Sequence, residues 1–131
     1  MNTAIPLKAQ GVLLHELAHA RSGDKGNRLN ICVVARERHF FQLLAEILTP
    51  ARVSAHFHHR CPSRVVRYDL PRLHAFNFVL DDVLDGGVNS SPGLDTHGKT
   101  LSFYLLGMVL DLPRQLLDAA ESDQFSSGDA L

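Results

Sequence analysis

The chain has 131 residues, a hydrophobic content of 45% and a formal net charge of -1 at pH 7. This length suits one compact domain with its own core and is too short for two domains of ordinary size. The near-neutral charge creates no overall field that would attract nucleic acid or an anionic membrane, so any binding driven by charge must be local.

Two further features predict the compartment. No stretch reaches the apolar length of a membrane span, and the first residues lack the basic and apolar regions of a secretion signal. The two cysteines, Cys32 and Cys61, form no spaced framework, which is typical of a reducing environment. We therefore expect a soluble cytoplasmic protein that binds neither nucleic acid nor membrane.

The first part of the chain predicts two strands joined by a loop. Residues 1–10 form a leader without periodicity. Residues 11–18 are apolar on both sides in their first half and predict an inner strand, and residues 30–36 are rich in β-branched side chains and predict a second strand. We expect the two strands to be antiparallel neighbours, joined by a loop over residues 20–30.

Two helices are predicted next. Apolar residues recur every three or four positions over residues 40–48, which predicts a helix with one broad apolar face. Thr49 and Pro50 are typical of an N-cap and a first helical position, and they predict the start of a second helix. Val53 and Phe57 are expected to face the core from that helix.

The rest of the chain predicts one more strand and two more helices. Residues 63–70 alternate as a half-buried strand does. Apolar residues between 73 and 84 recur at helical spacing, and Gly86-Gly87 follows where a left-handed helix end is expected. Asp95 is expected to cap a last helix, whose apolar side extends to Leu112.

This order of elements predicts an α+β fold, a two-layer sandwich with a small antiparallel or mixed sheet and helices on one face. The domain is expected over residues 11–112, between the leader and a short turn with a polar, mobile tail over residues 113–131. Half-covered strands with free edges commonly pair with another subunit. We therefore expect a homo-oligomer.

The most unusual chemistry lies in residues 20–30, A-R-S-G-D-K-G-N-R-L-N. Gly23 and Gly26 permit sharp turns that would direct backbone N–H groups into one concavity, which favours an anion. The basic residues of this stretch would add positive charge, and arginine binds a carboxylate or phosphate through two hydrogen bonds. The candidate ligand-binding residues are Arg21, Ser22, Gly23, Asp24, Lys25, Gly26, Asn27, Arg28 and Asn30.

A structural interpretation of the same stretch stays open. Glycine, asparagine, aspartate and serine are also the residues that close a turn through local backbone bonds. The spacing of the glycines matches neither a P-loop nor a dinucleotide-binding fingerprint. The sequence therefore supports a site here without naming a reaction.

Other polar clusters have simpler explanations. His56, His58, His59 and Cys61 bear zinc-binding side chains, but their spacing matches no standard zinc site. We interpret these histidines as solvated or as capping a helix end, and expect no metal.

Asp81, Asp82 and Asp85 fall on the polar side of a predicted helix, which indicates a solvated face. His15 in the first predicted strand and His19 directly after it are evenly spaced and would flank the loop from one face, where packing is the more common role.

Several stretches resemble the small carboxy-terminal domain of the AtuA-like proteins, which are named for acyclic terpene utilisation. They are L-A-H-A-R-S-G-D-K-G-N (17–27), Asn30-Ile31 with Val34-Ala35-Arg36, R-Y-D-L-P (67–71), N-F-V-L (77–80) and L-D-T-H-G-K-T-L (94–101). The resemblance covers most of residues 11–112 and implies a ferredoxin-like fold. It adds Asn77, Asp95 and Lys99, which occupy motif positions, as supporting site candidates.

The resemblance also implies a functional setting. Larger members of the family occur beside acyl-CoA enzymes in clusters for the breakdown of acyclic terpenes and branched acids, and they have a large amino-terminal domain that is absent here. It thus implies an accessory domain, a separate chain that supplies the large domain, and an acyl-CoA or carboxylate ligand. It implies no catalytic residues and no cofactor.

Three functions stay open. The preferred one is an accessory, subunit-like domain whose basic loop binds an anion. The second is a small enzyme acting on an acyl-CoA or carboxylate intermediate, with Lys25 or Asp24 as the acid–base group. The third is a purely structural oligomerisation domain.

Overall fold

The computed structural model describes residues 10–84, 97–114 and 117. In chain order the elements are β1 (Gln10–Leu13), α1 (Leu14–Leu17), β2 (Ala18–Lys25), β3 (Arg28–Ala35), α2 (Arg38–Ile47), α3 (Pro50–His56), the 3-10 helix η2 (His58–Arg60), β4 (Arg64–Leu70), the 3-10 helix η3 (Pro71–Leu73), β5 (Ala75–Asp81), α4 (His97–Leu106) and β6 (Val109–Leu112).

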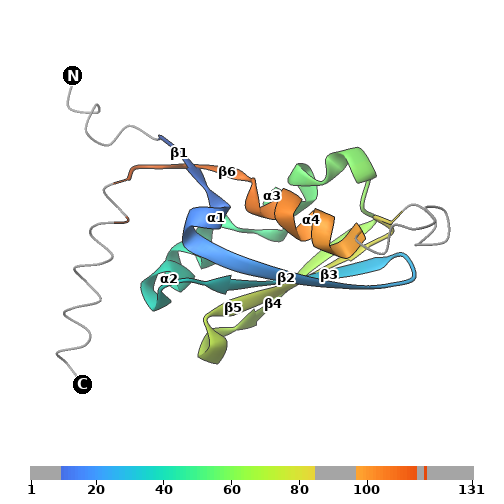
Figure 1. Cartoon of the computed structure of the whole chain (residues 1–131), viewed down its shortest axis with the longest axis horizontal. Helices are drawn as coiled ribbons and strands as arrows, with labels where there is room; N and C mark the ends of the chain where they lie inside the picture. Colours follow the sequence, from blue (N-terminus) through green and yellow to red (C-terminus); the bar gives the residue numbers. More distant parts are fainter. Residues whose placement is uncertain (1–9, 85–96, 115–116, 118–131) are drawn as a thin grey trace.

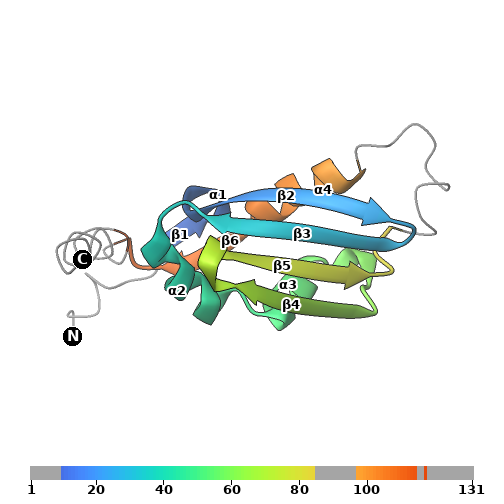
Figure 2. The same ribbon diagram turned by 90° about the horizontal axis from the view of Figure 1, so that it is seen from below.

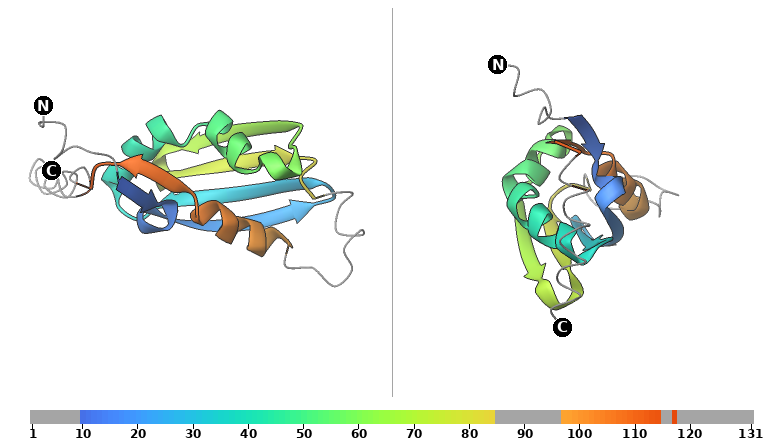
Figure 3. Two further views of the ribbon diagram at one scale, coloured as in Figure 1. Left: turned by 90° about the horizontal axis from the view of Figure 1, so that it is seen from above. Right: turned by 90° about the vertical axis from the view of Figure 1, so that its left-hand side faces the viewer.

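A four-stranded antiparallel sheet is the main layer, with the strand order β2-β3-β5-β4. Helices α3 and α4 and a small antiparallel sheet of β1 and β6 lie on one side of it (Figures 1 and 3). No described helix crosses the other side of the four strands (Figure 2). The predicted α+β sandwich with helices on one face is therefore confirmed.

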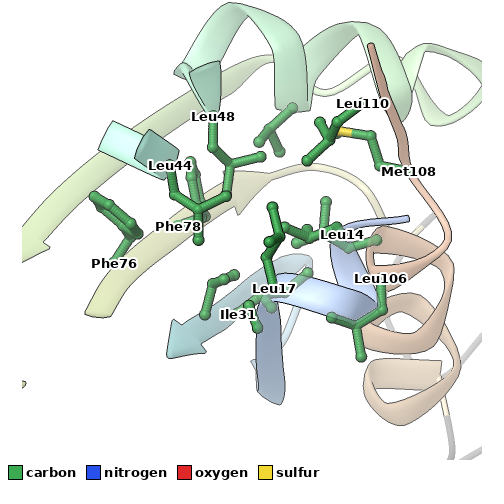
Figure 4. Close-up of a cluster of buried hydrophobic side chains, with 14 of the residues drawn as sticks. Leu14, Leu17, Ile31, Leu44, Leu48, Phe76, Phe78, Leu106, Met108 and Leu110 are labelled. Carbon is green, nitrogen blue, oxygen red and sulfur yellow. The ribbon is translucent and has the colours of Figure 1, made fainter. Parts of the chain in front are cut away.

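The core fills the space between the two layers. Alternate residues of the central strands, Ile31 and Val33 of β3 and Phe76 and Phe78 of β5, are fully buried. Leucines of α1 and α2 and the residues around β6 close over them (Figure 4). Each fully buried leucine or phenylalanine contributes about 1.5–3 kcal/mol of hydrophobic stabilisation, so the covered face of the sheet holds the layers together.

The predicted strand over residues 11–18 is wrong in part. It is interrupted by a single helical turn, α1, in which Leu14 and Leu17 are both buried because they lie three residues apart. The backbone N–H of Leu13 donates to the Glu16 carboxylate (3.2 Å) at the start of this turn. As a result β1 pairs with β6, and the strand that pairs with β3 begins only at Ala18.

The predicted helix over residues 73–84 is also wrong. Residues 75–81 form β5, in which Phe76, Phe78 and Leu80 alternate with less buried residues. Leu73, the first residue of the expected apolar stripe, is 65% exposed. The segment has strand neighbours on both sides, so sheet pairing outweighs the helical spacing of its other apolar residues.

The remaining elements agree better with expectation. Helix α2 forms, and α3 begins at Pro50 with the Thr49 hydroxyl accepting a hydrogen bond from the Arg52 N–H (3.1 Å). Val53 and Phe57 are fully buried, as predicted.

The last helix ends earlier than predicted. Helix α4 stops at Leu106, and β6 follows from Val109 to Leu112. The predicted glycine cap, the predicted Asp95 cap, residues 1–9 of the predicted leader and the tail after Leu117 lie outside the described residues, whereas Gln10, the last residue of that leader, begins β1. Among the described helices, none has the length and apolar character required to cross a bilayer.

Candidate functional site

Residues 18–35 form a hairpin rather than strands joined by a long loop. Strands β2 and β3 pair from Ala18–Ala35 to Lys25–Arg28, and only Gly26 and Asn27 form the turn. Gly26 has a φ of +64°, which a two-residue hairpin turn requires and glycine adopts readily. The expected concavity of backbone N–H groups is therefore wrong, because β2 and β3 are paired along their whole length.

The turn has a structural role of its own. The carbonyl oxygen of Asn27 accepts hydrogen bonds from the backbone N–H groups of Asp82 (3.0 Å) and Val83 (3.3 Å). It thereby ties the tip of the hairpin to the chain that leaves β5. For Gly26 and Asn27 the structure supports the interpretation as a turn.

The side of the four-stranded sheet that no described helix crosses (Figure 2) is the surface that we call the open face. Opposite residues of antiparallel strands share a face, so the pairings define its members. They are His19, Arg21, Gly23 and Lys25 of β2; Arg28, Asn30, Cys32 and Val34 of β3; Ala75, Asn77, Val79 and Asp81 of β5; and Arg64, Val66, Tyr68 and Leu70 of β4.

Five residues at the centre of the open face form what we call the Arg21 cluster: Arg21, Gly23, Asn30, Cys32 and Asn77. Arg21, Cys32 and Asn77 occupy directly paired positions on three neighbouring strands. The Asn30 Nδ2 group donates to Asn77 Oδ1 (3.4 Å). A Cβ atom at Gly23 would lie 3.1 Å from Asn30 Oδ1, so the missing side chain leaves room for the Asn30 amide.

Arg21 brings positive charge to these amides. It forms no hydrogen bond or ion pair with any described residue. Burial raises the pKa of the neighbouring Cys32 thiol, and Arg21 opposes that shift only in part. The thiol therefore stays neutral at pH 7, and no negative charge inside the cluster competes for the Arg21 guanidinium.

A more highly charged row crosses the end of the open face next to the turn. Arg28 Nε lies 2.6 Å from Asp81 Oδ1, and this contact lowers the pKa of Asp81 and raises the pKa of Arg28. Arg28 is thus neutralised within the chain. Lys25 and Arg64 are exposed and form no ion pair with described residues.

The structure separates the other predicted site residues. Ser22 and Asp24 lie on the helix side of β2, opposite the buried Ile31 and Leu29. The Ser22 Oγ atom is buried without a hydrogen-bond partner among the described residues. Asp95 and the side chain of Lys99 lie outside the described part of the molecule. The predicted residues that meet on one surface are therefore Arg21, Gly23, Lys25, Arg28, Asn30 and Asn77.

A family model described as the AtuA ferredoxin-like domain matches residues 12–111. The chain belongs to this family. The resemblance predicted from the sequence is thereby confirmed, together with the ferredoxin-like fold. No curated protein and no solved structure matches the chain. Because the match extends from β1 to β6, the open face is part of the AtuA ferredoxin-like domain itself.

Two residues of this AtuA ferredoxin-like domain escaped the sequence analysis of the site. Cys32 lies at the centre of the open face, and Tyr68, which is 54% exposed, lies opposite Asn77. Both belong to strands that were predicted. The sequence does not show which strands pair with each other. With that pairing known, the alternation of side chains along each strand would have placed Cys32 and Tyr68 on the same face as Arg21.

A second polar cluster borders the open face at the α1 end. Arg36 Nε donates to the carbonyl oxygen of His15 (2.8 Å), and its Nη1 lies 3.1 Å from His19 Nε2. His15 and His19 therefore contact one arginine, and through it α1 is joined to the first residues of β2.

The other histidines of the AtuA ferredoxin-like domain include a packing residue. His56 stacks on Tyr104 of α4, with ring centroids 4.3 Å apart. Its Nε2 lies 2.9 Å from the Tyr104 carbonyl oxygen, and the Tyr104 hydroxyl donates to the His56 carbonyl (2.9 Å). His56 is thus at a helix end, as predicted, but it joins α3 to α4, whereas His58 and His59 are exposed, as predicted. Within the described ranges, no group of three or more metal-binding side chains is suited to hold a metal ion.

The interpretation of Asp81 and Asp82 as a solvated helix face is wrong. Asp81 ends β5 in its pair with Arg28, and Asp82 accepts a hydrogen bond from the Ser63 hydroxyl. Both carboxylates therefore fix the hairpin and β4 to the end of β5. Asp85 lies outside the described residues.

Proposed function

We propose that this AtuA-like domain is an accessory domain that binds a carboxylate, or another anionic group of an acyl-CoA, through the Arg21 cluster. The observation that supports the proposal is that Arg21, without an ion-pair partner in the described chain, lies on an uncovered surface beside two amides. A free guanidinium beside neutral hydrogen-bonding groups is suited to a planar carboxylate.

The hydrogen bond between the two asparagines orients the site. Because Asn30 donates to Asn77 Oδ1, both N–H groups of the Asn77 amide stay available to an anion. Arg21 would bind the carboxylate through two hydrogen bonds, and Asn77 would donate a third. Lys25 would add long-range attraction from the end of the same strand.

The rest of the open face has the composition that a branched apolar ligand requires. Val66 and Val79 lie opposite each other next to the Arg21 cluster, and Tyr68 and Leu70 continue the apolar surface along β4. A branched acyl chain could lie across these residues while its anionic group contacts Arg21. The family setting suggests such ligands, because its larger members are linked to breakdown of acyclic terpenes and branched acids.

A partner chain would complete the site. A sheet face is broad, whereas small-molecule sites are usually concave, so we assign the opposite wall to a separate chain that carries the large AtuA-like domain. The cations of the open face oppose face-to-face contact of two copies. Self-association, as predicted from the sequence, would instead use the outer edges of β2 and β4, which have no strand partner in the described sheet.

The enzyme hypothesis receives less support. Asp24 and Lys25 are consecutive residues of one strand, so their side chains point to opposite faces of the sheet. Of these two alternative acid–base groups, only Lys25 therefore lies on the open face with the Arg21 cluster.

Isothermal titration tests the proposal with coenzyme A, a short branched acyl-CoA and the corresponding free acid. Arg21→Ala is expected to weaken binding of the anion about tenfold or more, because a hydrogen bond to a charged group contributes about 1.5–3 kcal/mol. Arg52→Ala is the matched control, since Arg52 is exposed on α3, on the helix side of the sheet. Equal affinities of the two variants would contradict the proposal, as would no binding either by the chain or by its complex with the large-domain chain.

A further inference from the structure

The outer edge of β4 is available to another strand. Strand β4 has seven residues, and each of them pairs with a residue of β5 on the inner side. On the outer side the described sheet has no further strand (Figure 2). The backbone N–H and C=O groups that point to this side therefore need water or another chain as their partner.

Strand β4 lacks the features that commonly protect such an edge from pairing. Those features are lysine, proline, a β-bulge and a very short strand. The sequence R-V-V-R-Y-D-L contains neither lysine nor proline, and its register with β5 is continuous. Its valines and its tyrosine are residues that favour strand pairing.

The other edge of the main sheet is less suited to a second copy. Strand β2 places Arg21 and Lys25 on the open face, whereas its one acid, Asp24, lies on the helix side. Two copies of β2 side by side would bring four cations onto one face, and like charges oppose pairing. We therefore consider the edge of β4.

Two copies of β4 can pair with complementary charges. A two-fold axis perpendicular to the sheet makes the two strands antiparallel and keeps both open faces on one side. With Tyr68 on this axis, Arg67 of each copy lies opposite Asp69 of the other copy. On the open face, Val66 lies opposite Leu70 of the other copy, and the two copies of Tyr68 meet.

The charges of β4 select this register over its neighbours. A shift of two residues is the smallest one that keeps each side chain on the same face of the sheet. In one direction this shift places Arg67 opposite Arg67, and in the other direction it places Asp69 opposite Asp69. Like charges directly opposite each other destabilise a strand pair, so the register centred on Tyr68 is favoured.

The exposure of these side chains agrees with such a contact. Tyr68 is 54% exposed, and Asp69 is 42% exposed although it accepts two hydrogen bonds from Arg67 (2.7 and 3.2 Å). Across the axis, each Arg67–Asp69 pair would lie beside the oppositely directed pair of the other copy. The four charges would thus alternate in sign.

We propose that two copies of the chain pair through β4, in the register centred on Tyr68, and join their four-stranded sheets into one continuous sheet. The two open faces then form one surface, with an apolar strip of Val66, Tyr68 and Leu70 from both copies between the two Arg21 clusters. The inference names the edge and the register of the self-association suggested above, and it does not depend on anion binding.

Sedimentation equilibrium of the full chain, without ligand, tests the pairing. The mass is expected to rise with concentration to twice that of one chain and no further. Tyr68→Lys places two like charges on the axis and should weaken the dimer about tenfold or more. Tyr68→Phe keeps the aromatic ring and should leave the dissociation constant within about twofold of the wild-type value.

Val109→Lys is the matched control. Val109 is also 54% exposed, but it belongs to β6 of the small sheet, so this substitution should leave the dimer intact. Both replaced side chains are exposed in the single chain, so the variants are expected to fold, which circular dichroism checks.

A disulfide cross-link tests the register. Tyr68→Cys is expected to link two copies on mild oxidation, because Cβ atoms directly opposite each other lie about 4.5–5.5 Å apart. Val66→Cys should not form a link between its two copies, because they would be offset by about 13 Å along the strands. Peptide mass spectrometry identifies the linked peptides.

Four results would overturn the inference. They are a wild-type chain that stays monomeric, equal association of Tyr68→Lys and Val109→Lys, equal cross-linking of Val66→Cys and Tyr68→Cys, and a mass that grows beyond the dimer. The last result would indicate head-to-tail pairing of β4 with β2, which does not close.

Titration with coenzyme A separates this inference from the proposed function. A dimer that binds no ligand, alone or with the large-domain chain, leaves the pairing in place and contradicts the proposed function. A monomer that binds the ligand supports the proposed function and contradicts the pairing.

Discussion

At the scale of single residues, Gly23 shows how a missing side chain can shape a site. It lies within a paired strand, so it is not needed for a turn. Because Gly23 has no side chain, the Asn30 amide can occupy the space above it. A glycine in a strand usually costs stability, so its presence here is explained by the geometry of the Arg21 cluster.

Gly23→Ala is expected to weaken anion binding by about three- to tenfold, because the new Cβ would displace the Asn30 amide and break its hydrogen bond to Asn77. The free energy of unfolding should change by less than about 0.5 kcal/mol, because alanine restricts the unfolded chain and thereby offsets the local crowding. Isothermal titration and urea denaturation measure the two effects.

Gly107→Ala is the control for this substitution. Gly107 lies after α4, where a Cβ would make an ordinary contact of 3.4 Å with the Tyr104 carbonyl oxygen. An affinity loss of the same size in both variants would show that the space above Gly23 does not shape the site.

The site could be predicted from the sequence only as a set of residue types. The stretch 20–30 has the right cations and amides, but its grouping depends on which side chains share a face. A loop would have brought Ser22, Asp24 and Arg21 together, whereas a strand places Arg21 on one face and the other two on the opposite face. Asn77 joins the cluster through β5, whose strand character was not predicted.

At the scale of elements, β4 directs three of its apolar side chains away from the helices. Its apolar residues Val66, Tyr68 and Leu70 face the open side, and Arg67 points towards the helices. Arg67 Nη1 donates to the carbonyl oxygens of Ala45 (2.9 Å) and Leu48 (3.0 Å) at the end of α2. A cation at the carboxy-terminal end of a helix satisfies carbonyl groups that have no partner within the helix.

Arg67→Ala is expected to lower the free energy of unfolding by about 2–3 kcal/mol, because it leaves two carbonyl groups without their donor. The substitution also removes the guanidinium from the Phe76 ring, whose centroid lies 4.9 Å away. Urea denaturation measures the loss.

Arg64→Ala serves as the control on the same strand, because Arg64 is exposed on the open face. It should change stability by less than about 0.5 kcal/mol. A similar loss in both variants would mean that the contacts of Arg67 with α2 do not stabilise the fold.

The sequence predicts best the elements whose formation depends on residues close together in the chain. Helix α3 follows from Thr49 and Pro50, and the buried side of α2 follows from spacing within one helix. Strand β5 could not be predicted in this way, because its strand state depends on pairing with β3 and β4 over long sequence distances. The break between β1 and β2 likewise depends on β6, near the other end of the described chain.

At the scale of the whole molecule, the inner strands of the main sheet are more enclosed by neighbouring strands than its edge strands and the small sheet. Strands β3 and β5 each have two strand neighbours in the main sheet, whereas β2 and β4 are its edges. Among the described strands, β1 and β6 have only each other as neighbours. Backbone groups with partners on both sides and buried apolar neighbours open least often.

Amide hydrogen exchange is therefore expected to be slowest at buried positions of the two inner strands, such as Ile31 and Phe78. Exchange in β1 and β6 should be about tenfold faster or more, because the small sheet can open without disrupting the main one. Nuclear magnetic resonance of the exchanging amides measures this order. Equal protection of the small sheet and the inner strands would indicate that the whole domain opens as a single unit.

The pairing of β1 with β6 has a practical consequence. Gln10 lies directly opposite Leu112, and this pair of strands lies at the other end of the molecule from the turn between β2 and β3 (Figure 1). The two attachment points are thus neighbours, separated by about one strand spacing of 4.8 Å. The domain can therefore be inserted into a surface loop of a host protein. It can also be circularly permuted, with Gln10 and Leu112 joined by a linker and new termini at Gly26, and every strand keeps its neighbours in both cases.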